Sequence, residues 1–149
     1  MTIEFMRDLL SKDEKITVEY KTCQHGVQED VYETVCSFSN RYGGYIIMGV
    51  EDDGTPIGIN PNMVKDMKKN FVNQLNNPDK MSPTLYLSIE DIVYEGMTLL
   101  WVYVPPTSTV EKCANRIYDR NEDGDMDITD SPIQLQNMYN RKSNTYAEH

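Results

Sequence analysis

The segment from Val35 to Gly58, VCSFSNRYGGYIIMGVEDDGTPIG, constrains the fold more than any other part of the chain. Apolar residues recur at helical spacing through residues 28–42, and this pattern stops at Gly43–Gly44. A helix end needs residues that tolerate positive φ angles, and glycine tolerates them best. We therefore expect a helix that ends at the glycine pair.

A strand is expected directly after the glycines. Residues 45–50 are apolar and include β-branched side chains, which is typical of a strand covered on both faces. Asp52, Asp53 and Gly54 form the next turn, and 55–59 is predicted to return as the second strand of a hairpin. This order of helix, strand, turn and strand indicates an α/β domain.

Periodicity and turn residues predict the remaining elements on either side of this segment. The expected helices cover residues 5–10 and 61–75 and start again at Ser131–Pro132, and the expected strands cover 16–22, 84–94 and 97–104. The run 97–104 is apolar on both faces, which predicts a central strand. We expect one α/β (α+β) domain over residues 1–149, with a mixed β-sheet flanked by helices.

Composition excludes several classes of protein. No apolar run approaches the ~20 residues of a membrane helix. Three cysteines without CxxC spacing do not make a disulfide framework or a zinc knuckle, and no phosphate-binding GxxxxGK[ST] motif is present. These features favour a cytoplasmic protein. Residues 141–149 show no obvious core positions, so the chain is expected to be the N-terminal module of a longer protein.

The net charge of −10 is unusual for a nucleic-acid-binding protein, because phosphate contacts normally come from an excess of lysine and arginine. The imbalance is partly local. Residues 119–130 hold six acidic side chains and one arginine, a net −5 of the −10. The rest of the chain is only mildly acidic.

Three carboxylates have positions that suggest a metal site. Glu14 and Glu19 flank the first predicted strand and Asp52 follows the buried one, so adjacent strands would bring them to one edge of the sheet. Such a cluster would bind Mg²⁺ or Mn²⁺ and activate water for phosphodiester cleavage, with Lys21 neutralising developing charge. In the alternative, Glu19 and Lys21 form a cross-strand ion pair and Asp52 shapes a turn.

The acidic segment 119–130 fits the spacing of a calcium-binding loop, although Asp replaces the usual Glu at its last position. The calcium ligands in this hypothesis are Asp119, Asn121, Asp123, Asp127 and Asp130. The alternative, implied by the family resemblance given next, is a strand at 116–120 followed by a hairpin turn at 121–124, with Met126 and Ile128 alternating on the returning strand.

Two motifs resemble a known family. FSNRYGGYIIMGVEDDGTPIG is similar to the pattern AFANTxGGxLxIGVDDxGxxxG of the Schlafen AlbA-like domain family, and EKITVEYK looks like its ExxxxEFK strand, with Tyr20 in place of Phe. The resemblance implies a nucleic-acid-binding domain of a bacterial transcriptional regulator. Some Schlafen proteins are RNA endonucleases with three acidic residues whose motif positions match Glu14, Glu19 and Asp52. Metal-dependent RNA or DNA cleavage is therefore an implied alternative.

A DNA or RNA partner requires basic side chains that share one face. The candidates are Arg41, Lys65, Lys68 and Lys69, together with Arg141 and Lys142. The acidic balance of the chain instead favours metal-assisted cleavage or a third hypothesis, a protein-interaction or oligomerisation module. The partners of such a module would be a second copy of the chain or the C-terminal domains of the full-length protein.

Overall fold

A computed structural model describes residues 1–11 and 16–147. Its central sheet has the order β1-β2-β5-β4, in which β1 is Val18–Lys21, β2 is Gly44–Met48, β5 is Met97–Val104 and β4 is Ile89–Tyr94. β1 and β2 run parallel, whereas β5 is antiparallel to both β2 and β4. The predicted mixed sheet is confirmed, and the apolar run 97–104 is an interior strand.

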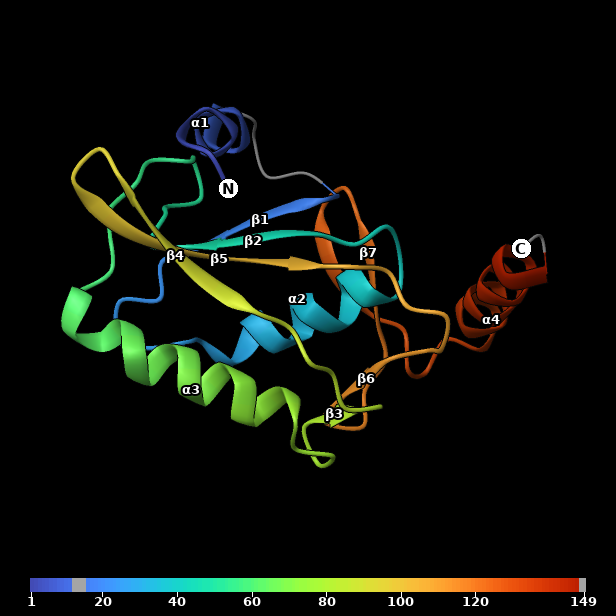
Figure 1. Cartoon of the computed structure of the whole chain (residues 1–149). Helices are drawn as coiled ribbons and strands as arrows, with labels where there is room; N and C mark the ends of the chain where they lie inside the picture. The colour runs from blue at the N-terminus through green and yellow to red at the C-terminus, as the bar shows by residue number, and fades with distance from the viewer. Residues whose placement is uncertain (12–15, 148–149) are drawn as a thin grey trace.

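Helices cover both faces of this sheet (Figure 1). α1 (Ile3–Ser11) lies on one face, and α2 (Glu29–Ser39) and α3 (Val64–Leu75) lie on the other. A short 3-10 helix, η1 (Pro61–Met63), leads into α3. No helix in the described ranges has the length and apolar character to cross a lipid bilayer.

Alternation along the strands divides the core into two layers. Ile46 and Met48 of β2 are fully buried with α2 and α3, whereas Ile47 is buried with α1. On β1, Val18 and Tyr20 pack towards α1, so Glu19 and Lys21 lie on the opposite side of the strand, as the sequence predicted. The face of β1 towards α2 is therefore charged.

The C-terminal third of the chain wraps around the end of α2. β3 (Met81–Ser82) pairs with β6 (Lys112–Cys113), and β7 (Tyr118–Asn121) pairs with β8 (Gly124–Asp127) in a hairpin. α4 (Pro132–Ala147) follows at the periphery (Figure 1). Met138 of α4 is buried against Ile117 and Ile128, which form a small third cluster.

The predicted strand 55–59 is wrong. Only an isolated bridge joins Val50 to Pro56, and the amides of Ile57 and Gly58 donate to Gly49 O at 2.8 and 3.0 Å. Proline has no amide to donate to a ladder, and Gly58 has a φ of +82°, so the segment turns instead of extending. Likewise, only Ile89–Tyr94 of the predicted strand 84–94 is a strand.

The expectation that residues 141–149 lack core positions is also wrong. α4 continues to Ala147, and Lys142 is only 8% exposed. Its ammonium group donates to Ser39 O and Thr109 O at 3.2 and 2.6 Å. The sequence gave no sign that Lys142 is buried, because the carbonyl groups that satisfy its charge come from segments far from it along the chain.

The glycine pair lies at the junction of α2 and β2, although the helix ends slightly earlier than predicted, with Asn40 as its C-cap. Gly43 has a φ of +73° and its amide donates to Phe38 O at 2.9 Å, which closes the helix end. A Cβ on Gly43 would lie 2.5 Å from Val104 O. Both the φ angle and the close approach of β5 therefore require glycine here.

Replacing Gly43 by alanine should cost more stability than the φ angle alone explains. Gly96 is the matched control, because its φ is +78° but a Cβ there has no neighbour within 4 Å. We expect Gly96→Ala to lower the free energy of unfolding by about 1–2 kcal/mol and Gly43→Ala by at least about 1 kcal/mol more. Urea denaturation measures both, and equal losses would show that the contact with β5 carries no energetic weight.

Candidate nucleic-acid interface

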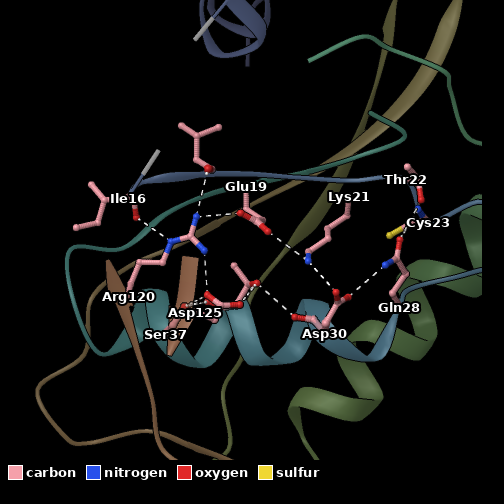
Figure 2. A network of polar contacts seen from close by, with 12 residues as sticks. Ile16, Glu19, Lys21, Thr22, Cys23, Gln28, Asp30, Ser37, Arg120 and Asp125 are labelled. Atoms are coloured by element: carbon pink, nitrogen blue, oxygen red, sulfur yellow. Dashed lines mark hydrogen bonds and ion pairs between the residues drawn. The ribbon is translucent and has the colours of Figure 1, made fainter. Parts of the chain in front are cut away.

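The side chain of Arg120, from β7, lies against the edge of β1 and is 2% exposed. Its two terminal nitrogens donate to Glu19 Oε2 and Asp125 Oδ1, each at 2.9 Å (Figure 2). Nε and Nη2 also approach the carbonyls of Ile16 and Val18 at 3.3 and 3.4 Å. The Arg120 guanidinium therefore provides hydrogen-bond donors for carbonyl groups at the open edge of the sheet. It also joins this edge to the β7–β8 hairpin.

The charged face of β1 continues this network towards α2 (Figure 2). Lys21 Nζ lies 3.3 Å from Glu19 Oε1 and donates to Asp30 Oδ2 at 2.9 Å. Although burial opposes it, the hydrogen bond to Asp30 and the charge of Glu19 hold the pKa of Lys21 above its ordinary value. Lys21 is therefore a cation fixed between two carboxylates.

The other end of the network docks the hairpin on α2. Asp125 accepts hydrogen bonds from the hydroxyls of Thr34 and Ser37 at 2.6 and 2.5 Å. Both hydroxyls come from buried positions of α2, one turn apart. Asp125 thus pairs with an arginine from its own hairpin and with two donors from the helix.

The structure describes Glu19, Lys21 and Asp52 of the four predicted catalytic residues. Glu19 and Lys21 form the ion pair of the structural alternative, although within β1 and not across strands, whereas Asp52 lies in the exposed turn beyond β2. Glu14 lies outside the described residues. Within the described residues, no three acidic, histidine or cysteine side chains gather to hold a metal ion.

The five predicted calcium ligands are spread along the β7–β8 hairpin and the turn after it. Asp119 pairs with Arg41, and Asp127 and Asp130 pair with Arg116. The turn at 121–124 matches the hairpin alternative, with Asn121 Oδ1 accepting from the amide of Asp123 at 2.8 Å. The structure therefore does not bring these five side chains around one point.

The predicted nucleic-acid-binding residues separate into two groups. Lys65, Lys68 and Lys69 belong to α3, where Lys68 pairs with Asp91 of β4. Arg41 follows the end of α2, and α3 and α4 lie at opposite sides of the molecule in Figure 1. The lysines of α3 and Arg41 therefore do not share one basic face.

Arg41 is instead brought together with Arg141 and Lys142, the two basic residues of α4. All three line a pocket of about 320 Å³ at the end of α2, which we call the basic pocket. Its other lining residues are Asn40, Tyr42, Pro106 and Thr107. The pocket is therefore assembled from α2, the loop after β5 and α4.

Asp119 lies between the two arginines of the basic pocket. Arg41 binds it in a bidentate pair, with Nε to Oδ1 at 3.1 Å and Nη2 to Oδ2 at 2.8 Å. Arg141 Nη2 lies 3.5 Å from Asp119 Oδ1 and donates to Asn40 O at 2.8 Å. Two guanidinium groups share one carboxylate, so these three side chains carry a net positive charge.

A buried acid lies near Lys142 at the base of α4. Glu111 is fully buried, and neither of its carboxylate oxygens has a hydrogen-bond partner among the described residues. Burial raises the pKa of Glu111 to about 8, although the positive charge of Lys142 opposes the shift. Burial likewise lowers the pKa of Lys142 to about 8, and Arg141 adds to this shift. The charge of this pair therefore changes near neutral pH.

Sequence reasoning missed the residues that organise the site. Arg120 was assigned to a strand and Asp125 was counted only as part of the acidic excess, whereas the structure pairs them. A sequence signal for this pair does exist. Arg120 and Asp125 flank the predicted hairpin turn symmetrically, so they are expected to face each other across the ladder, as they do. Nothing in the sequence indicates that Glu111 is buried.

This architecture defines the class of the protein as a small α/β domain, with a mixed four-stranded sheet and a hairpin docked on its central helix. The chain belongs to the Schlafen AlbA_2 family, whose model matches residues 4–129. Arg41 and Asp119 lie within the matched region, whereas Arg141 and Lys142 follow it. No curated protein matches the chain.

Solved structures share the fold. The N-terminal domain of a RecG-related protein from Nitrosomonas europaea, named for the ATP-dependent DNA helicase, is 27% identical with a TM-score of 0.56, over 70% of this chain and 72% of that one. The DIP2311 protein from Corynebacterium diphtheriae has a TM-score of 0.59 at 16% identity, over 84% of this chain and 29% of that one. The similarity to the DIP2311 protein shows a shared fold and nothing further.

The buried Glu111 should make stability depend on pH. Between the ordinary value of 4.5 and about 8, the folded protein keeps a proton on Glu111 that the unfolded chain releases. Stability is therefore highest below this range and falls as pH rises through it. Glu111→Gln keeps a neutral group of the same shape and cannot release this proton. The melting temperature of the variant minus that of the wild type should therefore increase from pH 5 to pH 8. The exposed Glu122→Gln is the control, and parallel curves for all three proteins would contradict the assignment.

Proposed function

We propose that this chain is a nucleic-acid-binding module that holds phosphate groups in the basic pocket. The observation that carries the proposal is the convergence of Arg41 and Arg141 on the single carboxylate of Asp119. Their side chains remain 25% and 29% exposed, so both can turn part of their donor set towards a ligand. Guanidinium groups bind phosphate through paired donors, and the shared carboxylate fixes their orientation beforehand.

The local charge is compatible with a polyanion despite the net −10 of the chain. Several carboxylates of the acidic segment are neutralised by arginines, with Asp125 bound to Arg120 and Asp127 bound to Arg116. The basic pocket adds Lys142, whose ammonium group lies among backbone carbonyls. A small basic site on an acidic domain is expected to contact few phosphates, so binding should be weak and moderately sensitive to salt.

The family and the helicase-related relative support a role on DNA or RNA. Within that role, we propose that the domain anchors a longer bacterial protein, such as a transcriptional regulator, to its nucleic acid. The metal-dependent nuclease is not advanced as a second function, because Glu19 and Lys21 are engaged in ion pairs with Arg120 and Asp30.

The test compares the loss of one charge in the basic pocket with the loss of one charge on α3. Arg141→Gln leaves the bidentate pair of Arg41 with Asp119 intact, so the fold should be preserved. We expect it to weaken oligonucleotide binding roughly fivefold, equivalent to about 1 kcal/mol. The slope of log K against log salt should fall by about 1.

The matched control is Lys69→Gln, an exposed position on α3. It should leave both the affinity and the salt slope unchanged when fluorescence anisotropy is measured at several salt concentrations. Equal losses in the two variants would show that only net charge matters. Absence of oligonucleotide binding by the wild type at low salt would refute the proposed function.

A further inference from the structure

A second depression, of about 420 Å³, lies where α1 meets the start of β2 and the end of β5. Four aromatic side chains line it, namely Phe5, Tyr42, Tyr45 and Tyr103, and we call it the aromatic cleft. Phe5, Tyr42 and Tyr103 are 40%, 59% and 44% exposed. Single exposed aromatic residues are ordinary, but several around one cleft mark a binding surface.

The rings form a continuous arrangement along the sheet. The Tyr45 ring is 5.3 Å from that of Phe5 in an edge-on contact and 5.0 Å from that of Tyr103. Tyr45 and Tyr103 are register partners on β2 and β5, so the sheet fixes their separation. Rigid rings on adjacent strands offer flat apolar surfaces that need no rearrangement to receive a planar ligand.

The aromatic cleft adjoins the basic pocket at Tyr42. Tyr42 lines both, and the Arg41 guanidinium lies 5.8 Å from the centre of its ring. Gly43, which needs its positive φ, holds Tyr42 at this position between α2 and β2. A ligand that carries a planar apolar group next to an anionic group would therefore span both sites.

We propose, on the basis of the proposed nucleic-acid binding, that the occupant is a single strand. Its unpaired bases stack on Tyr42 and Tyr103, and its phosphates lie at Arg41 and Arg141. Base stacking on aromatic side chains beside a basic groove is the general mode of single-strand binding, and it tolerates any base because every base has a flat face. A duplex keeps its bases stacked inside and cannot offer their faces to the cleft.

The charges around the cleft give the strand an orientation. Phe5 and Leu9 of α1 line the side of the cleft that belongs to the N-terminal helix, and no basic side chain is among the described residues that line the cleft. The arginines lie beyond Tyr42, at the other side. The sugar-phosphate backbone therefore follows the basic pocket, and the bases point towards α1.

The test uses the 149-residue chain, a labelled oligothymidylate and a duplex of equal length. Tyr103→Ala should weaken binding of the single strand roughly 5- to 150-fold, the range of one lost base stack, and should change duplex binding less than twofold. Tyr103→Phe should bind as the wild type does, because stacking needs the ring and not the hydroxyl. Tyr86→Ala is the matched control, since Tyr86 is 79% exposed and does not line the cleft.

The chain also carries its own reporter. Trp101 is its one tryptophan, and its ring lies 6.2 Å from that of Tyr45. Its fluorescence should change when the single strand binds, and less so in Tyr42→Ala.

The outcomes separate this proposal from the proposed function. If Arg141→Gln weakens binding but Tyr103→Ala and Tyr42→Ala do not, the stacking proposal is wrong and phosphate binding stands. Tighter binding of the duplex than of the single strand would also overturn the stacking proposal and leave phosphate binding standing. If neither nucleic acid binds and an unstructured Tyr-rich or Pro-rich peptide does, the cleft is a peptide site and both proposals fail.

Discussion

The buried guanidinium of Arg120 is the interaction on which the arrangement of the C-terminal third depends. A charge that is 2% exposed is costly unless it is paired and fully hydrogen-bonded, and Arg120 meets this condition through Glu19 and Asp125. Its guanidinium also lies 4.8 Å from the centre of the Phe38 ring of α2. Removing one partner would leave a buried uncompensated charge, so β1, α2 and the β7–β8 hairpin are fixed as a unit.

The position of the basic pocket follows from that constraint. With the hairpin held on α2, Asp119 lies beside the helix end and reaches Arg41. Asn40, which is 1% exposed, reinforces the contact by donating to Glu111 O and Tyr118 O at 3.0 and 2.9 Å. α4 then packs where Arg141 can approach the same carboxylate. The pocket is thus a consequence of how the hairpin docks.

The sequence predicted the parts of the fold that depend on local patterns. The helix before Gly43 and the apolar run 97–104 follow from periodicity, and both are present. The hairpin turn at 121–124, which the family resemblance implied as the alternative to a calcium loop, is present as well. The strand predicted at 55–59 failed because Pro56 has no amide to donate to a ladder and Gly58 adopts a positive φ, so the segment turns.

The site was harder to predict than the fold, because its residues meet only through tertiary contacts. Arg41 was grouped with the lysines of α3, but its partner in the structure is Asp119, far along the chain. Glu19 and Lys21 were placed on the correct face of β1, yet their neighbour Arg120 could not be inferred. The aromatic cleft escaped notice because Phe5, Tyr42 and Tyr103 belong to three separate elements, and each residue alone is unremarkable.

Nucleic acid is proposed to bind across the basic pocket and the adjoining aromatic cleft. Amide chemical-shift mapping by NMR, during titration with an unlabelled single-stranded oligonucleotide, locates the binding surface residue by residue. We expect the largest changes at Tyr42, Gly43 and Tyr103 and at Arg141, with little change along α3. Changes concentrated on Lys65 and Lys69, or on the turn around Asp52, would place the ligand elsewhere and refute this surface.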